Sequence, residues 1–229
     1  MDCPHYRAAR CRSCTELEQP YATQLAAKQA QARALLAAHA GLQWLAAVES
    51  REAGFRNKAK MVVSGTAAAP VLGIRDSAGQ GVALGDCPLY PGSMQACFPA
   101  ITAFIVRAAL DPYDLVSRRG ELKLVLLTEG PDGALMLRFV LRSEATVARI
   151  RKHLPSLLAA LPQLRVVSVN LQPEHKAVLE GEREILLTEA SRLTIQVNDI
   201  RLQLRPQSFF QTNTEIAAAL YAQARDWIT

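Results

Sequence analysis

Cysteine spacing is the feature that most constrains this chain of 229 residues. The first fourteen residues, MDCPHYRAARCRSC, hold Cys3, Cys11 and Cys14, and a fourth cysteine, Cys87, lies far downstream in the stretch GDCPLYP. The N-terminal segment is basic and has too little apolar surface to fold by itself. Four thiolates can enclose a metal centre, and a Cys-x-x-Cys pair lets two sulfurs bind at one site. The cysteines therefore predict a metal site, and their spacing alone leaves open whether it holds zinc or an iron–sulfur cluster.

The alternatives for these cysteines are a disulfide and free buried thiols. No apolar signal region is found at the N-terminus, which argues against secretion and hence against a disulfide. Free core thiols would not cluster ahead of any apolar core. The fifth cysteine, Cys97, lies inside an apolar pattern at helical spacing, so we expect it to be a core thiol rather than a ligand.

Composition indicates a globular protein of one large or two small domains, because half of its residues are apolar. No apolar run approaches the length of a membrane span, and we expect a cytoplasmic monomer without a membrane partner. The net charge is +5, and residues 1–60 contain nine Lys or Arg against five acidic residues. A basic segment around a metal centre suits a polyanion such as nucleic acid, although a solvated charged face explains the charge equally well.

Residues 55–63, FRNKAKMVV, predict a strand that is entered through a basic turn. This turn combines one aromatic ring, one amide and three cations, in Phe55, Arg56, Asn57, Lys58 and Lys60. Such a mixture suits RNA, whose bases stack on aromatic side chains and whose phosphates attract cations. The alternative is an ordinary exposed strand end.

The remaining patterns predict an α+β body with a sheet that is mainly antiparallel. Helices are expected at 21–39, at 93–109 with Pro99 kinking or shortening the helix, and at about 144–160 after Ser143 as N-cap. A strand and Gly-rich turn are expected over 72–84, a hairpin from 121–128 and 134–142 around EGPDG, a strand over 165–173 and two or three strands beyond. Thr212 and Glu215 have capping-box spacing, which places Gln211 just before the last helix.

Taken together, several stretches resemble the iron–sulfur-containing RNA (uracil-5-)-methyltransferases, and among them the enzymes that methylate a uridine of bacterial 23S ribosomal RNA. The stretches are MDCPHYRAARCRSC, GFRNKAKMVVSG, GDCPLYP, RRGELK, LMLRFVLRS and RPQSFFQTN, and they run in order through almost the whole chain. The resemblance implies a [4Fe–4S] cluster on Cys3, Cys11, Cys14 and Cys87, which favours iron over zinc. It also implies that Gln211 contacts S-adenosylmethionine. We hypothesise that residues 55–60, together with Arg119, Lys123, Arg138 and Arg142, stabilise a splayed-out RNA segment.

The resemblance implies three parts: a small iron–sulfur segment with the first RNA-contacting elements at 1–90, a central antiparallel-sheet RNA-binding domain at 91–210, and a linker helix at 211–229. In the family, a Rossmann-like domain follows with the Gly-rich cofactor loop, the nucleophilic cysteine and the general base. None of these occurs in the sequence, so we expect residues 1–229 alone to be inactive. The alternatives are a non-enzymatic RNA-binding module with a structural iron–sulfur or zinc site, and a redox iron–sulfur protein.

Overall fold

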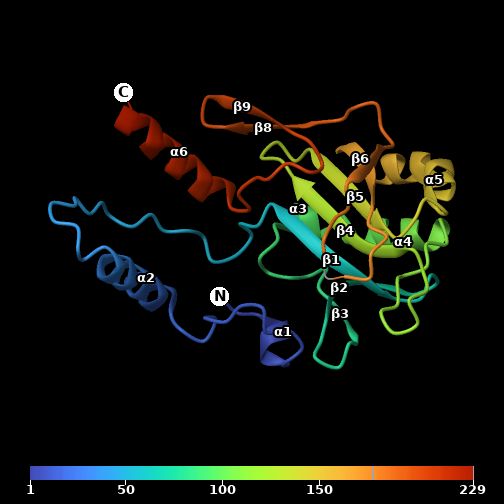
Figure 1. Cartoon of the computed structure of the whole chain (residues 1–229), viewed down its shortest axis with the longest axis horizontal. Coiled ribbons are helices and arrows are strands. Elements are labelled where there is room, and N and C mark those ends of the chain that lie inside the picture. Colours follow the sequence, from blue (N-terminus) through green and yellow to red (C-terminus); the bar gives the residue numbers. More distant parts are fainter. Residues whose placement is uncertain (177, 229) are drawn as a thin grey trace.

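A seven-stranded sheet forms the centre of the computed structural model, which describes residues 1–176 and 178–228 (Figure 1). Its strands are β1 (Lys58–Gly65), β2 (Pro70–Arg75), β3 (Gly81–Ala83), β4 (Leu122–Glu129), β5 (Leu135–Leu141), β6 (Leu164–Leu171) and β7 (Arg183–Leu186). The order across the sheet is β3-β2-β1-β4-β5-β6-β7. Neighbouring strands are antiparallel except β5 and β6, which are parallel. The predicted α+β class with a mainly antiparallel sheet is confirmed.

The β4–β5 hairpin forms where the alternating pattern and the turn residues predicted it. Gly133 adopts a φ of +79°, a left-handed conformation that glycine tolerates, and the Asp132 carboxylate accepts a hydrogen bond from the Ala134 amide. Both strands are nearly continuous in burial, because one face of the hairpin packs on helices and Met136, on the other face of β5, lies under a second layer.

Helices α4 (Phe98–Arg107) and α5 (Val147–Ala160) supply the apolar residues that cover one face of the sheet. Phe104 of α4 packs against Phe139 of β5 with ring centroids 5.5 Å apart. Of the two effects expected of Pro99 on the helix over 93–109, the structure shows the shortened helix: α3 (Gly92–Gln95) ends first, and α4 then begins with Pro99 in its first turn, where a missing amide hydrogen costs little.

The start of α5 also differs from the prediction. Ser143 does not cap it, since the helix begins at Val147 after Thr146. Instead, the Ser143 hydroxyl donates to Glu121 Oε2 at 2.6 Å and so joins this loop to the start of β4.

A second, smaller layer covers the opposite face of β5 and β6. It consists of the hairpin β8 (Leu193–Val197) and β9 (Ile200–Leu204), together with α6 (Thr214–Ile228). Met136 and Val166 from the sheet meet Ile195, Leu204 and Phe210 in this layer. The layer places the segment 205–213, which contains Gln211, beside the central sheet.

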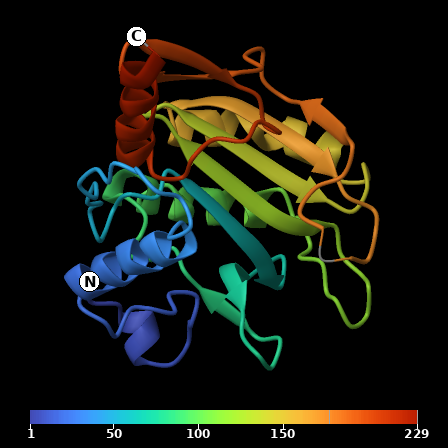
Figure 2. The same ribbon diagram turned by 60° about the vertical axis from the view of Figure 1, so that its left-hand side comes forward.

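The N-terminal part contains α1 (Pro4–Arg7) and α2 (Tyr21–Leu35). Figures 1 and 2 show α2 standing away from the sheet, on the same side as α6. No residue of α2 is buried. The sheet takes strands from both sides of the boundary expected at residue 90, because β1 pairs with β4. Within the described residues, no helix is long and apolar enough to cross a membrane.

Candidate functional site

The four cysteines of the predicted metal site line one cavity of about 170 Å³. Cys3 is buried directly before α1, whose first residue is a proline, and the Cys11 amide donates to the carbonyl of His5 at 3.3 Å. Cys87 lies in a turn that follows β3, with its amide donating to the Leu84 carbonyl at 3.2 Å. Folding therefore brings the N-terminal segment and the distant GDCPLYP stretch to the same cavity.

Burial raises the pKa values of the Cys14 and Cys87 thiols, and the neighbouring cysteines raise both further. Arg56 opposes this effect at Cys14, because its positive charge favours the thiolate. Burial also raises the pKa of Tyr90, which lines the same cavity, to about 12. The thiols are thus close enough to influence one another's ionisation.

No group of three or more His, Cys, Asp or Glu side chains within residues 1–176 and 178–228 is arranged to hold a metal ion. Cys97 lies apart from the cavity in the hydrophobic core, where its thiol donates to the Ser93 carbonyl at 3.2 Å. This placement agrees with its apolar sequence surroundings.

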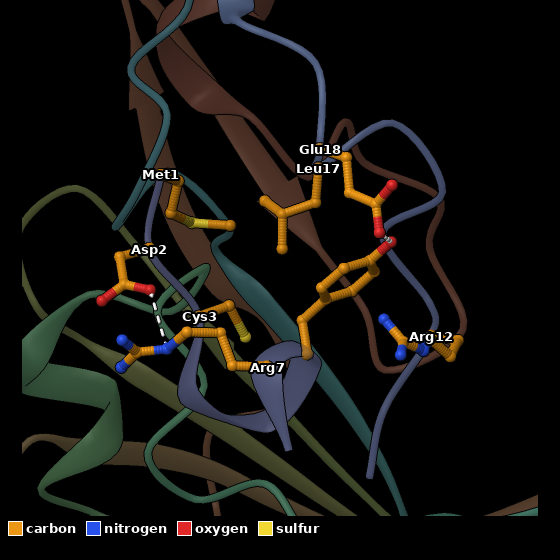
Figure 3. Close-up of a pocket in the computed structure, with 8 residues that line it drawn as sticks. Met1, Asp2, Cys3, Arg7, Arg12, Leu17 and Glu18 are labelled. Carbon is orange, nitrogen blue, oxygen red and sulfur yellow. Dashed lines mark hydrogen bonds and ion pairs between the residues drawn. The ribbon is translucent and has the colours of Figure 1, made fainter. Parts of the chain in front are cut away.

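A second hollow of about 380 Å³ adjoins the cysteine cavity, because Cys3 lines both (Figure 3). Asp2 and Arg7 form an ion pair at its rim, 3.2 Å apart. Tyr6 donates its hydroxyl hydrogen to Glu18 at 2.8 Å, and the guanidinium of Arg12 lies 4.2 Å from the centre of the Tyr6 ring. Local polar contacts, rather than an apolar core, shape this N-terminal segment.

The predicted RNA-contacting turn leads directly from this cavity into β1. Arg56 and Lys60 line the cysteine cavity, and Lys60 is exposed. Burial lowers the pKa of Lys58, and the charges of Lys60 and Arg138 lower it further. Phe55 is half-buried and lines another cavity, of about 340 Å³, together with Glu129.

The other cations named from the sequence differ in how far their charges are already paired. Arg138 is 2% exposed and pairs with Glu184, 2.9 Å away, and with Glu180. Arg142 binds Glu121 at 2.7 Å with a partly exposed side chain. Lys123 contacts Gln172 and donates to the Glu174 carbonyl at 2.7 Å, whereas Arg119 is exposed.

Gln211, the residue expected to contact the cofactor, has an exposed side chain just before α6. Its backbone carbonyl accepts a hydrogen bond from Asn57 Nδ2 at 2.9 Å. The predicted capping box was wrong, because Asn213 precedes the helix and accepts from the Ile216 amide at 3.2 Å. Phe209 is 84% exposed beside Gln211, whereas Phe210 is buried.

Two residues of the site were missed by the sequence reasoning. His5 lines the cysteine cavity and is 3% exposed, and its Nε2 atom lies 2.7 Å from Asp86 Oδ1. Their positions next to the cysteines, in Cys-x-His and Asp-Cys, are the only sequence signal that could have indicated them.

Comparison with known proteins gives similar chains along the whole sequence. The chain is 56% identical over all 229 residues to the 23S rRNA (uracil(747)-C(5))-methyltransferase RlmC of Edwardsiella ictaluri, and 55% identical to proteins of the same name from Yersinia pestis and Yersinia pseudotuberculosis. The whole chain resembles these methyltransferases. It spans 61% of the length of each of these relatives. No protein-family profile matches the chain.

A solved structure shares the fold. The tRNA (uracil-54, C5)-methyltransferase of Pyrococcus abyssi, solved with S-adenosyl-L-homocysteine, aligns with a TM-score of 0.72 and 18% identity. The match covers 94% of this chain and 50% of the archaeal one. The fold of most of this chain is therefore found in another protein of known structure.

Proposed function

We propose that this chain is part of an S-adenosylmethionine-dependent methyltransferase that forms 5-methyluridine in 23S ribosomal RNA. The carrying observation is the 56% identity to an RlmC protein over all 229 residues. The chain spans 61% of that relative's length, so we propose the activity for the whole protein rather than for residues 1–229 alone. A cytoplasmic location and a monomeric state are part of the same proposal.

The proposal assigns a [4Fe–4S] cluster to Cys3, Cys11, Cys14 and Cys87. Two observations support this assignment, although no three of these side chains are placed to hold a single metal ion: four thiols line one cavity, and His5 Nδ1, which is buried, has no partner among the described residues. In a cubane cluster each thiolate binds its own iron atom, so the sulfurs lie farther apart than around a single zinc ion. A tetrahedral zinc site would require them to be about 3.8 Å apart. A bound cluster would supply iron–thiolate bonds that cross-link residues 1–14 to the Cys87 loop.

Uridine methylation needs a thiolate that adds to C6 of uracil and a base that removes the C5 proton. Four of the five cysteines are assigned to the cluster and Cys97 is buried in the core, so the proposal places the nucleophile outside residues 1–229. Residues 1–229 would instead hold the RNA and one wall of the cofactor site, with Gln211 contacting S-adenosylmethionine. The candidate RNA contacts are Phe55, Arg56, Lys58, Lys60, Arg119, Lys123 and Arg142, whereas Asn57 and Arg138, also named from the sequence, are buried and bonded within the chain.

The test compares residues 1–229 with a protein extended through the downstream reading frame. Each is incubated with unmodified 23S rRNA and S-adenosylmethionine labelled in its methyl group. We expect the extended form alone to transfer label, and the variant Gln211→Ala to reduce the transfer. Label transferred by the short form would show that the catalytic centre has been misplaced. RNA binding without transfer by either form would favour the non-enzymatic RNA-binding module.

A further inference from the structure

His5 joins two segments of the cysteine site that lie far apart in the sequence. Its imidazole Nε2 is 2.7 Å from Asp86 Oδ1, across 81 residues of chain, and its side chain is buried while that of Asp86 is 70% exposed. The His5 carbonyl also accepts hydrogen bonds from the amides of Arg10, at 2.9 Å, and Cys11, at 3.3 Å. One residue thus contacts both the loop that carries Cys11 and the loop that carries Cys87.

Both partners of this contact lie close in sequence to cysteines of the cavity. His5 follows Cys3 by two residues, and Asp86 directly precedes Cys87. The other polar contacts of the N-terminal segment include local ones, such as Asp2 with Arg7 and Tyr6 with Glu18, and an ion pair between the Met1 amino group and Glu52, which lies outside the loop that carries Cys87. Cysteines from both segments line the cavity. The cavity is therefore closed only while the N-terminal segment lies against the 84–90 turn.

We propose that His5 and Asp86 form a latch that holds the N-terminal cysteines against Cys87, so that the cluster is assembled and retained. The inference rests on the proposed cluster and makes both residues positioning residues rather than ligands. The imidazole donates through Nε2 to the carboxylate, in the way that groups outside a metal's ligand shell orient the ligands themselves. We expect the latch to form without the cluster as well, because the hydrogen bond joins two groups of the chain itself.

The first experiment measures how fast the anaerobically reconstituted protein loses iron to a chelator. We expect His5→Leu and Asp86→Ala each to lose iron about tenfold faster than the unaltered protein, as the loss of one strong hydrogen bond implies. The double variant should lose it no faster than either single one. His5→Gln, whose amide nitrogen can replace Nε2 as the donor, should restore retention.

Asp2→Asn is the matched control. It weakens an exposed ion pair with Arg7 next to Cys3, as Asp86→Ala breaks the latch next to Cys87, and should leave retention unchanged. Asp86 is exposed, so its replacement keeps the inference testable if His5→Leu fails to fold. Equal rates of iron loss from the unaltered protein, His5→Leu and Asp86→Ala would overturn the latch.

The second experiment separates the latch from the cluster. Metal-free protein is treated with a short bifunctional maleimide, and the cross-link between Cys14 and Cys87 is followed by mass spectrometry. Cross-linking slowed in Asp86→Ala but not in Asp2→Asn supports the latch, even if the unaltered protein binds no iron and the cluster proposal fails. Equal cross-linking rates in all variants would overturn it.

Discussion

Asn57 Nδ2 donates a hydrogen bond to Thr214 Oγ1 at 2.7 Å and so ties the start of β1 to the start of α6, 157 residues later. The same amide reaches the Gln211 carbonyl, and the Asn57 backbone amide donates to the Thr212 carbonyl at 2.9 Å. Asn57 is 8% exposed, so its amide is committed to this internal contact. The contact holds the segment that carries Gln211 against the sheet.

Asn57→Ala should therefore lower the free energy of unfolding by about 1–3 kcal/mol, since it leaves buried acceptors without their donor. Denaturant unfolding followed by circular dichroism measures the change. Gln203→Ala is the control, because Gln203 donates to Thr194 on the exposed side of the β8–β9 hairpin. If Asn57→Ala lowered the free energy of unfolding no more than Gln203→Ala does, Asn57 would not hold the segment that carries Gln211 against the sheet.

Replacement of the buried Arg138 should be much more damaging than replacement of an exposed arginine. Arg138→Ala leaves the Glu184 carboxylate, 13% exposed, without its positively charged partner, and we expect a loss of about 3–5 kcal/mol. Arg183 pairs with Glu144 at the surface, so Arg183→Ala should cost less than about 1 kcal/mol. Unfolding free energies of similar size for the two variants would show that the Arg138 pair is not a structural element.

RNA binding should depend on the exposed cations named above. Lys60→Ala and Arg119→Ala should each reduce the slope of log affinity against log salt concentration by about one, as expected for one lost phosphate contact. Arg149→Ala, an exposed position on α5 across the sheet, is the control and should leave the slope unchanged. Unchanged slopes at Lys60 and Arg119 would return both residues to an ordinary solvated surface.

The buried carboxyl group of Glu129 should make the free energy of unfolding depend on pH. Burial raises the pKa of its carboxyl group, only partly offset by a hydrogen bond with Ser93. The folded protein therefore holds this proton at pH values where the unfolded chain has released it, and folding stability falls as pH rises from the ordinary pKa of glutamate through the raised one. Glu129→Gln removes this penalty.

The variant should accordingly be more stable than the unaltered protein at pH 7, and the difference should shrink toward pH 4. Thermal unfolding at a series of pH values measures it. Glu182→Gln, at an exposed position, controls for the change in net charge. An advantage of Glu129→Gln that is equal at all pH values would contradict the assignment.

Local patterns were sufficient to predict the β4–β5 hairpin and the apolar setting of Cys97. They could not predict that β1 lies between β2 and β4, or that β6 runs parallel to β5, because strand order depends on contacts between distant segments. Pro99 was predicted to kink or shorten a helix, and in the structure α4 begins beside it. Propensity alone does not distinguish these two outcomes, since proline suits the first turn of a helix.

In the candidate site, too, some residues could be predicted from local sequence and others could not. Spacing identified Cys3, Cys11, Cys14 and Cys87 as one group, because thiols so placed have few structural uses. His5 was missed, since a single histidine in a basic segment has no distinguishing pattern until folding places Asp86 beside it. Arg138 was named for RNA from its charge alone, and only the structure reveals its buried acidic partners.

The iron, zinc and acid-labile sulfide content of the anaerobically purified protein tests the cluster assignment most directly. We expect about four iron and four sulfide per chain, unchanged in Cys97→Ser and lost in Cys87→Ser. Stoichiometric zinc without sulfide would contradict the assignment of Cys3, Cys11, Cys14 and Cys87 to an iron–sulfur cluster, as would loss of iron in Cys97→Ser.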